Sequence, residues 1–449
     1  IYKYDIIKSL NNTTIVSSIN MEKNMEKLIS QLKAQNKLIN IVRCQPKISK
    51  TALSEYLKVS WPTVSTNIEA LKKSGIFDPD EGLAINGEFA YMVGLSVGSA
   101  QIKLSIIDMN FLPISADFFS KLIQDLNLFE EARSYMLEKN KPISNYIFFP
   151  TPDNLFELQQ KLDSIIADII KIVENQDSYH MNIISLGIAF TGAIDNVGKK
   201  IVRSHNLEYL SDRPLNTIIY PNRLDFFEQK GINLYIDNNS NASVVAEKYN
   251  MYNPDSTNYK YRNKKNMMIL YLGAGTGAGL IFNNALYHGA TNLAGEVGHI
   301  ELPPYPNQNF KAIEPCCSCG SCECLDYRIR NDVFEMTKKE FSELSSKEIK
   351  DYLINHPEKF EIFTYYIGKI INLLVNLLNP DLIIFTGKFK EVADYMWPLL
   401  YKQIATNKLS YIANACEFKT SNLGATSPAI GIAICAYFDK IGEAIDWQF

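Results

Sequence analysis

Gly295-Glu296-Val297-Gly298-His299, a proline-rich loop, and Cys316-Cys317-Ser318-Cys319-Gly320-Ser321-Cys322-Glu323-Cys324-Leu325-Asp326 follow one another in this chain of 449 residues. Five of the eight cysteines fall within these last eleven positions. Core packing does not explain the cluster, because cysteine is a minor filler of apolar cores. Soft thiolates with one imidazole are the donor set of a closed, tetrahedral zinc site. The stretch therefore predicts a structural metal site, and a pair of disulfides or idle thiols is the alternative.

Two carboxylates, Glu296 and Asp326, bracket the cysteine-rich loop. They are candidates to present oxygen atoms to a polar ligand. The remaining cysteines, Cys44, Cys416 and Cys435, stand alone among apolar residues and are expected to be reduced core residues.

Length and composition indicate a soluble protein with roughly two to four domains. The apolar fraction is 46% and the charged fraction 21%, both ordinary for globular chains. The sequence has no apolar run of about 18 residues, which a membrane-spanning helix requires. The first residues lack a basic segment followed by a long apolar one, so no signal peptide is expected. We therefore expect a cytoplasmic protein that does not enter a membrane.

The charge distribution singles out residues 28–77. This segment has eight basic and only two acidic residues, although the whole chain has a net charge of −4. A basic module on an acidic body is typical of nucleic-acid binding, and a lysine-rich solvated surface is the alternative.

Helical periodicity from Met25 to Arg43, a Ser49 cap before a second helix and Pro62 at the start of a third predict a helix-turn-helix. A short hairpin after Gly75 completes a winged domain over residues 25–86, preceded by an arm over 1–24. Small polar groups on the third helix suit the major groove, and lysines suit phosphates. The candidate DNA-binding residues are Lys50, Ser60, Thr63, Ser65, Thr66, Asn67, Lys72 and Lys73. The acids Asp78, Asp80 and Glu81 predict a short wing that does not contact DNA. A helical hairpin with a polar surface is the alternative to this domain.

The rest of the chain predicts an α/β body. Two apolar strands around a Gly-Ser turn are expected over 91–108. Further strands are expected at 183–190, 232–236, 267–272 and 379–387, which end in glycine or in Asn and Asp residues. Polar turns at strand ends would line a common cleft. The turn from Gly273 to Gly279 is rich enough in glycine to cradle a phosphate, but a tight hairpin explains it equally well. Residues 116–146 look like an insertion.

These pieces, in this order, resemble the ROK family, which contains sugar-responsive repressors and sugar kinases. The most specific match is Gly295-Glu-Val-Gly-His299 followed by Cys317-x-Cys319-Gly-x-x-x-Cys324-Leu-Asp326, although this chain has Glu323 where the family usually has Gly and Asp326 where it usually has Glu. The resemblance implies a winged helix-turn-helix followed by an actin-like body with two α/β lobes. The first lobe is expected over 87–205 plus 426–449, and the second, with the zinc loop, over 206–425.

The resemblance also implies the site residues. The zinc ligands would be His299, Cys317, Cys319 and Cys324, which leaves Cys316 and Cys322 as bystanders or supporting thiols. The sugar-binding residues would be Asn238, Asn239, Glu296, His299 and Asp326. Thr191, Gly192 and Asn206 are further candidates for the same cleft.

Two positions depart from the kinases of the family. Those kinases have an Asp, the general base, where Asn239 stands, and an amide cannot accept a proton at neutral pH. Their first phosphate loop reads Asp-x-Gly-Gly-Thr, where this chain has Ser96-Val97-Gly98-Ser99-Ala100. No catalytic residue is therefore expected, because parts needed for phosphoryl transfer are missing.

The prediction is a sugar-responsive DNA-binding regulator, a repressor or less often an activator, that acts on operator DNA as a homodimer or a dimer of dimers. An active ATP-dependent sugar kinase with a DNA-binding head is the first alternative. A zinc-stabilised DNA-binding protein without a ligand is the second.

Overall fold

The computed structural model describes residues 28–126, 134, 146–308, 310–405, 415–445 and 447. The expected arm over 1–24 lies outside these residues. So does most of the expected insertion beyond α4 (Ala116–Leu126).

The N-terminal head is a helix-turn-helix, as predicted. A helix over 28–44 is followed by α2 (Lys50–Leu57) and α3 (Trp61–Lys73). Ser49 and Ser60 cap the two short helices by accepting hydrogen bonds from the backbone N–H groups of Ala52 and Thr63. Val64, Ile68 and Leu71 form the buried stripe of α3, which its spacing predicted.

The wing is as short as the acidic residues suggested. Phe77 and Ile85 form a single antiparallel bridge. Asp78 does not reach outward, because its carboxylate accepts the backbone N–H groups of Asp80 and Glu81 and so shapes the turn.

The first lobe is a five-stranded sheet in the order β3-β2-β1-β4-β8. Its strands are β1 (Tyr91–Val97), β2 (Gln101–Ile107), β3 (Ile147–Pro150), β4 (Ile183–Phe190) and β8 (Asn233–Asn238). β1 pairs antiparallel with β2 and parallel with β4, and β4 pairs parallel with β8. The helices α6 (Leu155–Glu174), α7 (Gln176–Tyr179) and α8 (Pro221–Gln229) belong to this lobe, as does a small sheet of β5 (Ala193–Asp195), β6 (Lys200–Arg203) and β7 (Arg213–Pro214).

The second lobe repeats this topology in the order β11-β10-β9-β12-β13. Its strands are β9 (Met267–Leu272), β10 (Thr276–Phe282), β11 (Ala285–Leu286), β12 (Leu382–Gly387) and β13 (Glu417–Thr420). Its helices include α10 (Leu325–Arg328), a π-helix at Ile329–Phe334, α11 (Lys338–Glu343), α12 (Ser346–Asn355), α13 (Pro357–Leu378) and α14 (Ala393–Ala405). β9 pairs antiparallel with β10 and parallel with β12, as β1 does with β2 and β4. Asn283 and Asn284, with φ of 51° and 61°, form the hairpin tip between β10 and β11.

The structure moves the boundary between the lobes from residue 205 to Asn238. Leu207, Leu210 and Ile236 pack in one apolar core with Val93 of β1 and Ile188 of β4. β8 also belongs to the first sheet. The sequence did not predict this arrangement, because the small sheet and α8 lie between β4 and β8 in the chain.

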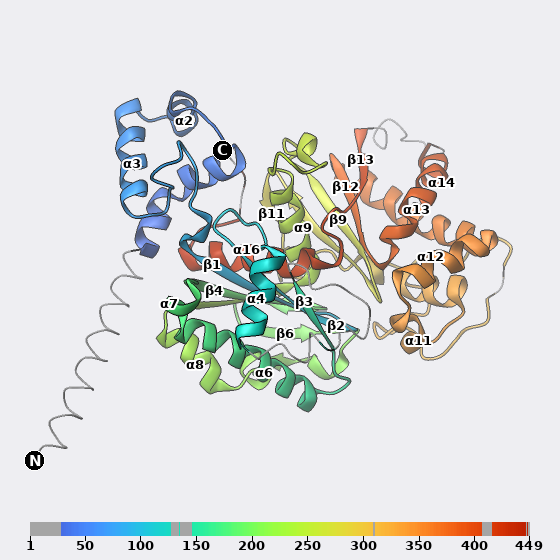
Figure 1. Ribbon diagram of the computed structural model, residues 1–449. Coiled ribbons are helices and arrows are strands. Elements are labelled where there is room, and N and C mark those ends of the chain that lie inside the picture. The colour runs from blue at the N-terminus through green and yellow to red at the C-terminus, as the bar shows by residue number, and fades with distance from the viewer. Residues whose placement is uncertain are drawn as a thin grey trace, which may run out of the picture.

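Two helices join the lobes and the head. α9 (Asn239–Asn250) begins directly after β8, and α16 (Ser427–Ile441) packs against α9 and against β1, β4 and β8. The helices approach closely at Gly431, where a methyl group would lie 1.7 Å from the carbonyl oxygen of Ala242. Figure 1 shows the head at one end of the body, away from α11 and α12.

α13 is long and apolar enough to cross a membrane by length and composition, and 56% of its most apolar window is buried inside the protein. Phe363, Ile367 and Ile371 place this helix in the core of the second lobe. Core helices of soluble proteins pass the same test, so α13 is weak evidence for a membrane span.

Candidate functional site

A cleft of about 680 Å³ lies between the two lobes. All five residues predicted to bind sugar line it, as do the further candidates Thr191, Gly192 and Asn206. Turns at the ends of β1, β4, β8 and β9 meet here, as the polar residues at the strand ends predicted. The five residues are Asn238, Asn239, Glu296, His299 and Asp326.

Asn239 is held in place by the first strand. Its side-chain oxygen accepts a hydrogen bond from Ser96 Oγ at 2.9 Å, and its Nδ2 donates to the carbonyl oxygen of Val97 at 3.2 Å. Asn239 is 9% exposed and Ser96 is 3% exposed. The amide is thus fixed by its own donor and acceptor, a pattern that a carboxylate cannot satisfy.

Asn238 has a different role from its neighbour. It caps α9 by accepting a hydrogen bond from the backbone N–H of Ser240 at 2.6 Å, and its Nδ2 donates to the carbonyl oxygen of Gly192 at 2.5 Å. This side chain therefore fixes the start of α9 at the cleft wall.

Asp326 supplies a half-buried carboxylate on the opposite wall. Its Oδ1 accepts the backbone N–H of Thr276 at 2.8 Å, at the start of β10. Burial raises the pKa of Asp326 to about 6. A methyl group on Gly298 would lie 2.7 Å from both carboxylate oxygens, so glycine is needed for this close approach.

Glu296 and His299 lie beside Asp326. Burial raises the pKa of Glu296, and the positive charge of His299 opposes that rise. Nε2 of His299 lies 3.8 Å from Oε2 of Glu296, while Nδ1 lies 3.5 Å from the sulfur of Cys317. Burial lowers the pKa of His299, but the hydrogen bond with Cys317 and nearby acidic groups outweigh it, so the pKa is raised. One ring nitrogen therefore faces the cysteine cluster and the other faces the cleft.

The structure brings the four predicted metal ligands together. The donor atoms of His299, Cys317, Cys319 and Cys324 all lie within 4.8 Å of one another. Donor atoms at about 2.0–2.3 Å from a tetrahedral zinc are separated from one another by less than about 4 Å. The four donor atoms therefore need to move only slightly closer together to reach that geometry. A hydrogen bond from Cys324 lowers the pKa of the Cys317 thiol to about 3, so a thiolate is already favoured in this cluster. The cluster can hold a metal ion.

Cys316 and Cys322 form a disulfide rather than remaining free thiols, which corrects the expectation from sequence. The chain turns back at Gly320, where φ is +93°, and the two Cα atoms come within 4.8 Å. The disulfide alternative thus applies to this pair, while Cys317, Cys319 and Cys324 remain free.

The cysteine loop also contacts the first lobe. Arg203 Nη2 donates to the carbonyl oxygen of Ser318 at 3.1 Å, and His205 Nδ1 lies 3.0 Å from Ser318 Oγ. The His205 ring meets that of His299 edge-on at 4.2 Å. Burial lowers the pKa of His205 to about 4, and the neighbouring His299 adds to this effect. Sequence analysis missed His205, and its place next to Asn206 was the only signal.

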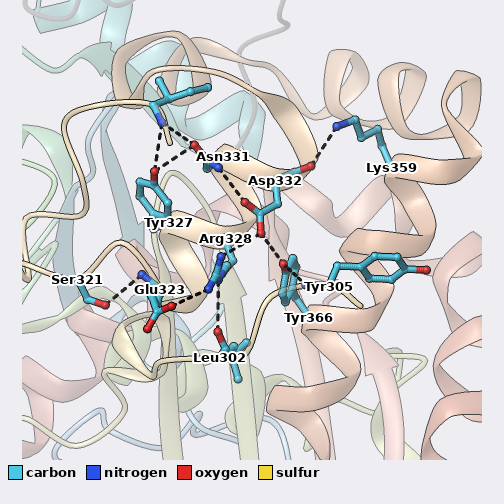
Figure 2. A network of polar contacts seen from close by, with 11 residues as sticks. Leu302, Tyr305, Ser321, Glu323, Tyr327, Arg328, Asn331, Asp332, Lys359 and Tyr366 are labelled. Atoms are coloured by element: carbon cyan, nitrogen blue, oxygen red, sulfur yellow. Dashed lines mark hydrogen bonds and ion pairs between the residues drawn. The ribbon is translucent and has the colours of Figure 1, made fainter. Parts of the chain in front are cut away.

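A buried polar network anchors the cysteine loop to α13 (Figure 2). The Arg328 guanidinium binds Glu323 at 3.1 Å, the carbonyl oxygen of Leu302 at 3.3 Å and the Asp332 carboxylate at 3.5 Å. Tyr366 on α13 donates to the same Asp332 carboxylate. Leu302 and Glu323 flank the loop, so Arg328 ties both of its ends to the core of the second lobe.

The glycine-rich turn is a hairpin that also lines the cleft. Gly273 N–H donates to the carbonyl oxygen of Gly275 at 3.0 Å between β9 and β10, and both glycines face the cleft. A methyl group on Gly275 would lie 2.7 Å from Nδ2 of Asn206. Lys388, which sequence analysis missed, lines the same part of the cleft, and burial lowers its pKa to about 8.

The structure places the predicted DNA-binding residues on α3, at its cap and at the start of α2. Several polar groups there are already engaged. Ser60 and Thr63 bind each other at 2.8 Å, Thr66 donates to the carbonyl oxygen of Pro62 at 3.0 Å, and Lys72 donates to the carbonyls of Pro79 and Glu81 at 3.0 Å. The remaining predicted residues, Lys50, Ser65, Asn67 and Lys73, are at least partly exposed.

Sequence analysis missed Trp61 on this face. It is the first residue of α3 and is 51% exposed, with Lys50 Nζ 5.8 Å from its ring centre. The sequence feature that could have pointed to Trp61 is its position as a large aromatic residue directly after the capping Ser60.

Comparison with known proteins identifies the family. The xylose repressor of Bacillus subtilis is 24% identical over 86% of this chain and 90% of its own. A glucokinase of Halalkalibacterium halodurans is 24% identical over 59% of this chain and 80% of its own. The crystal structure of a ROK family transcriptional regulator, described as a homologue of the E. coli MLC protein, has a TM-score of 0.60 at 15% identity and covers 95% of this chain and 98% of that one. The sequence pattern of the ROK family matches residues 152–437, so the chain belongs to the ROK family.

Proposed function

We propose that this chain is a transcriptional repressor that binds operator DNA through its head and releases it when a sugar binds between the lobes. The observation that carries the proposal is the Ser96–Asn239 hydrogen bond. Both residues stand where the kinases of the family have acids, and here they bind each other instead. The pocket keeps carboxylates and amides for sugar hydroxyls. It has no base at the position that would activate one.

We propose zinc as the metal of the loop, held by His299, Cys317, Cys319 and Cys324. A metal there would act structurally, closing the loop that carries His299 and precedes Asp326. The contacts of Ser318 with Arg203 and His205 support a second consequence, because the loop spans both lobes. A metal that orders this loop would also favour the closed cleft.

α9 offers a path from the pocket to the head. It begins at Asn239 in the cleft and ends near Tyr249, which packs against Phe111 and Phe438 in the apolar core shared with the head. Lobe closure on a sugar would shift this helix against the head. In a homodimer, or a dimer of dimers, the spacing of the paired heads would then no longer fit the operator half-sites. Operator binding also implies the cytoplasm of a bacterial cell.

The names of the relatives suggest which sugar to test first. Curated relatives covering most of this chain are called xylose repressors. Xylose is therefore the first effector to test, followed by other pentoses, hexoses and amino sugars.

An ATP-dependent sugar kinase with a DNA-binding head is the second candidate. The glycine-rich turn in the cleft and the glucokinase among the relatives favour it. ADP release measured over the same sugar panel tests it. Turnover well above background would replace the repressor proposal.

DNA binding is tested by gel shift on DNA upstream of the chain's own gene at several salt concentrations. Log affinity should fall by about 0.9 per log unit of salt for each phosphate contacted. Asn67→Ala and Lys73→Ala should weaken binding. Glu228→Gln, at an exposed position of α8 outside the head, is the control and should bind DNA as the wild type does. Binding with no preference for the upstream DNA would count against a specific regulator. DNA binding without a thermal shift from any sugar would favour a ligand-free DNA-binding protein.

A further inference from the structure

A second, smaller cavity lies where the head meets the body. Its volume is about 150 Å³, and it is separate from the sugar cleft. One wall comes from the end of the first head helix, another from the turn after β2, and a third from the end of α9. The residues that matter here are Arg43, Phe111, Leu112, Tyr249, Leu423 and Ile430.

Arg43 brings a buried positive charge to this cavity. It is 7% exposed, and its guanidinium carbon lies 3.7 Å from the ring centre of Phe111. Nε donates to the carbonyl oxygen of Met109 at 3.0 Å, and Nη1 donates to Asn40. Nη2 is buried without a hydrogen-bond partner among the described residues, which also offer Arg43 no ion pair within 4.0 Å. The Asp108 carboxylate and the Tyr437 hydroxyl interact with Arg43 and compensate part of its charge. A buried charge that is only partly compensated is costly, so this site favours an anion.

Tyr249 adds a second unused polar group. Its hydroxyl is buried and has no hydrogen-bond partner among the described residues. Burial raises the pKa of this hydroxyl well above its ordinary value, so it stays protonated and can donate. The wall around these two groups is apolar, because Phe111, Leu423 and Ile430 supply it.

We propose that this cavity binds a small organic acid. Arg43 Nη2 and the Tyr249 hydroxyl are both covered in this structure, so a small side-chain shift would bring them to the carboxylate, and the apolar part of the ligand would lie against Phe111 and Ile430. A cavity of this volume takes a ligand about the size of benzene. Charge-assisted hydrogen bonds are the strong ones, so the charge of the ligand should dominate its affinity.

The cavity lies beside α9, the helix proposed above to connect the sugar cleft with the head. Arg43 belongs to the head, while Tyr249 lies near the end of the helix that begins at Asn239 in the sugar cleft. The helix of twelve residues spans about 18 Å. A ligand here would bridge the head and α9 without entering the sugar cleft.

The test uses the full chain and benzoate as the probe, with benzamide as the neutral counterpart of similar shape. Isothermal titration calorimetry and thermal shift are run at matched ionic strength. Benzoate should bind with saturation and raise Tm, and benzamide should bind at least about tenfold more weakly because it lacks the charge. The readout needs neither DNA nor sugar, so it succeeds or fails independently of the proposed function.

Two variants locate the binding. Arg43→Gln should weaken benzoate binding about tenfold or more. Because Arg43 also supports the head, Leu112→Trp provides a second variant that narrows the cavity from a side chain 45% exposed and leaves Arg43 intact. Val197→Trp, at a residue 88% exposed outside the cavity lining, is the matched control and should bind benzoate as the wild type does. The proposal is overturned if the wild type shows no saturable benzoate binding, if benzamide binds equally well, or if Leu112→Trp binds as tightly as Val197→Trp.

Discussion

Ser96 Oγ donates a hydrogen bond of 2.9 Å to the side-chain oxygen of Asn239, across 143 positions of sequence. Ser96 is the second-last residue of β1 and Asn239 is the first residue of α9, so the bond joins the phosphate-loop position to the position of the catalytic base. The nitrogen of the same side-chain amide, Asn239 Nδ2, donates to the carbonyl oxygen of Val97. The departures from the kinase pattern therefore fit each other as a hydrogen-bonded pair.

Restoring the acid alone should not restore catalysis. Asn239→Asp replaces the donating nitrogen by an oxygen that faces the Val97 carbonyl oxygen, so the free energy of unfolding should fall by about 1–3 kcal/mol. ADP release should stay at background. Ser96→Ala, which adds no charge, should cost about 0.5–1.5 kcal/mol and serves as the control. Urea unfolding and a coupled ADP assay give both readouts. Turnover by Asn239→Asp would mean that the other parts of a kinase site are intact.

Metal content distinguishes the four proposed ligands from their neighbours. The purified chain should contain about one zinc per chain, and Cys324→Ser should lose it because a structural site needs all four donors. Cys316→Ser, eight residues away in the same loop, should keep the zinc. Elemental analysis of the folded proteins measures this. Equal zinc loss in both variants would show that the ligand set is different.

The two acids around Arg328 should differ sharply in their contribution to stability. The Asp332 side chain is 0% exposed and the Glu323 side chain 63% exposed. Asp332→Ala should lower the free energy of unfolding by about 3–5 kcal/mol, because it leaves the Arg328 charge buried without its partner. Glu323→Ala should cost no more than about 1 kcal/mol. Denaturant unfolding compares them, and similar losses would contradict the assignment of Asp332 as the anchor of the loop.

A buried ion pair between the lobes makes stability depend on pH. His288 Nε2 lies 2.7 Å from Asp237 Oδ2, and Tyr235 also donates to that carboxylate. Burial lowers the pKa of His288, but the hydrogen bond and charge of Asp237 outweigh it and hold the pKa above its ordinary value of 6.5. A raised pKa in the folded state stabilises the fold fully below the unfolded value, and this stabilisation is lost as pH rises through the folded value.

His288→Gln should therefore lose most stability relative to the wild type below about pH 6.5, with the difference shrinking at higher pH. Asn292→Ala is the control, since its bond to Asn196 links the same loop to the first lobe without a titrating group. Unfolding free energies across this pH range provide the measurement. A difference that stays constant with pH for His288→Gln would exclude the charged pair.

The sequence predicted local features better than their assembly. Capping serines, a proline at a helix start and an apolar stripe act over a few residues, so α2, α3 and the buried face of α3 were predictable. Through the resemblance, the cysteine spacing led to four residues whose donor atoms the structure brings together. The boundary at Asn238 was not predictable, because strand order depends on pairing between distant segments. His205, Lys388 and Arg43 were missed for the same reason, since each acquires its role only from residues far away in sequence.

The most direct test of the account measures operator binding against sugar concentration by fluorescence anisotropy, with labelled DNA from upstream of the gene. The wild type should release the DNA as xylose, or another sugar that raises its Tm, saturates the cleft, with DNA affinity falling about 5- to 150-fold. Glu296→Gln should need about tenfold more sugar for the same release, because it loses a charged acceptor in the cleft. Glu228→Gln, on the exposed side of α8, should behave as the wild type does. A sugar that saturates the cleft and leaves DNA affinity unchanged would contradict the account.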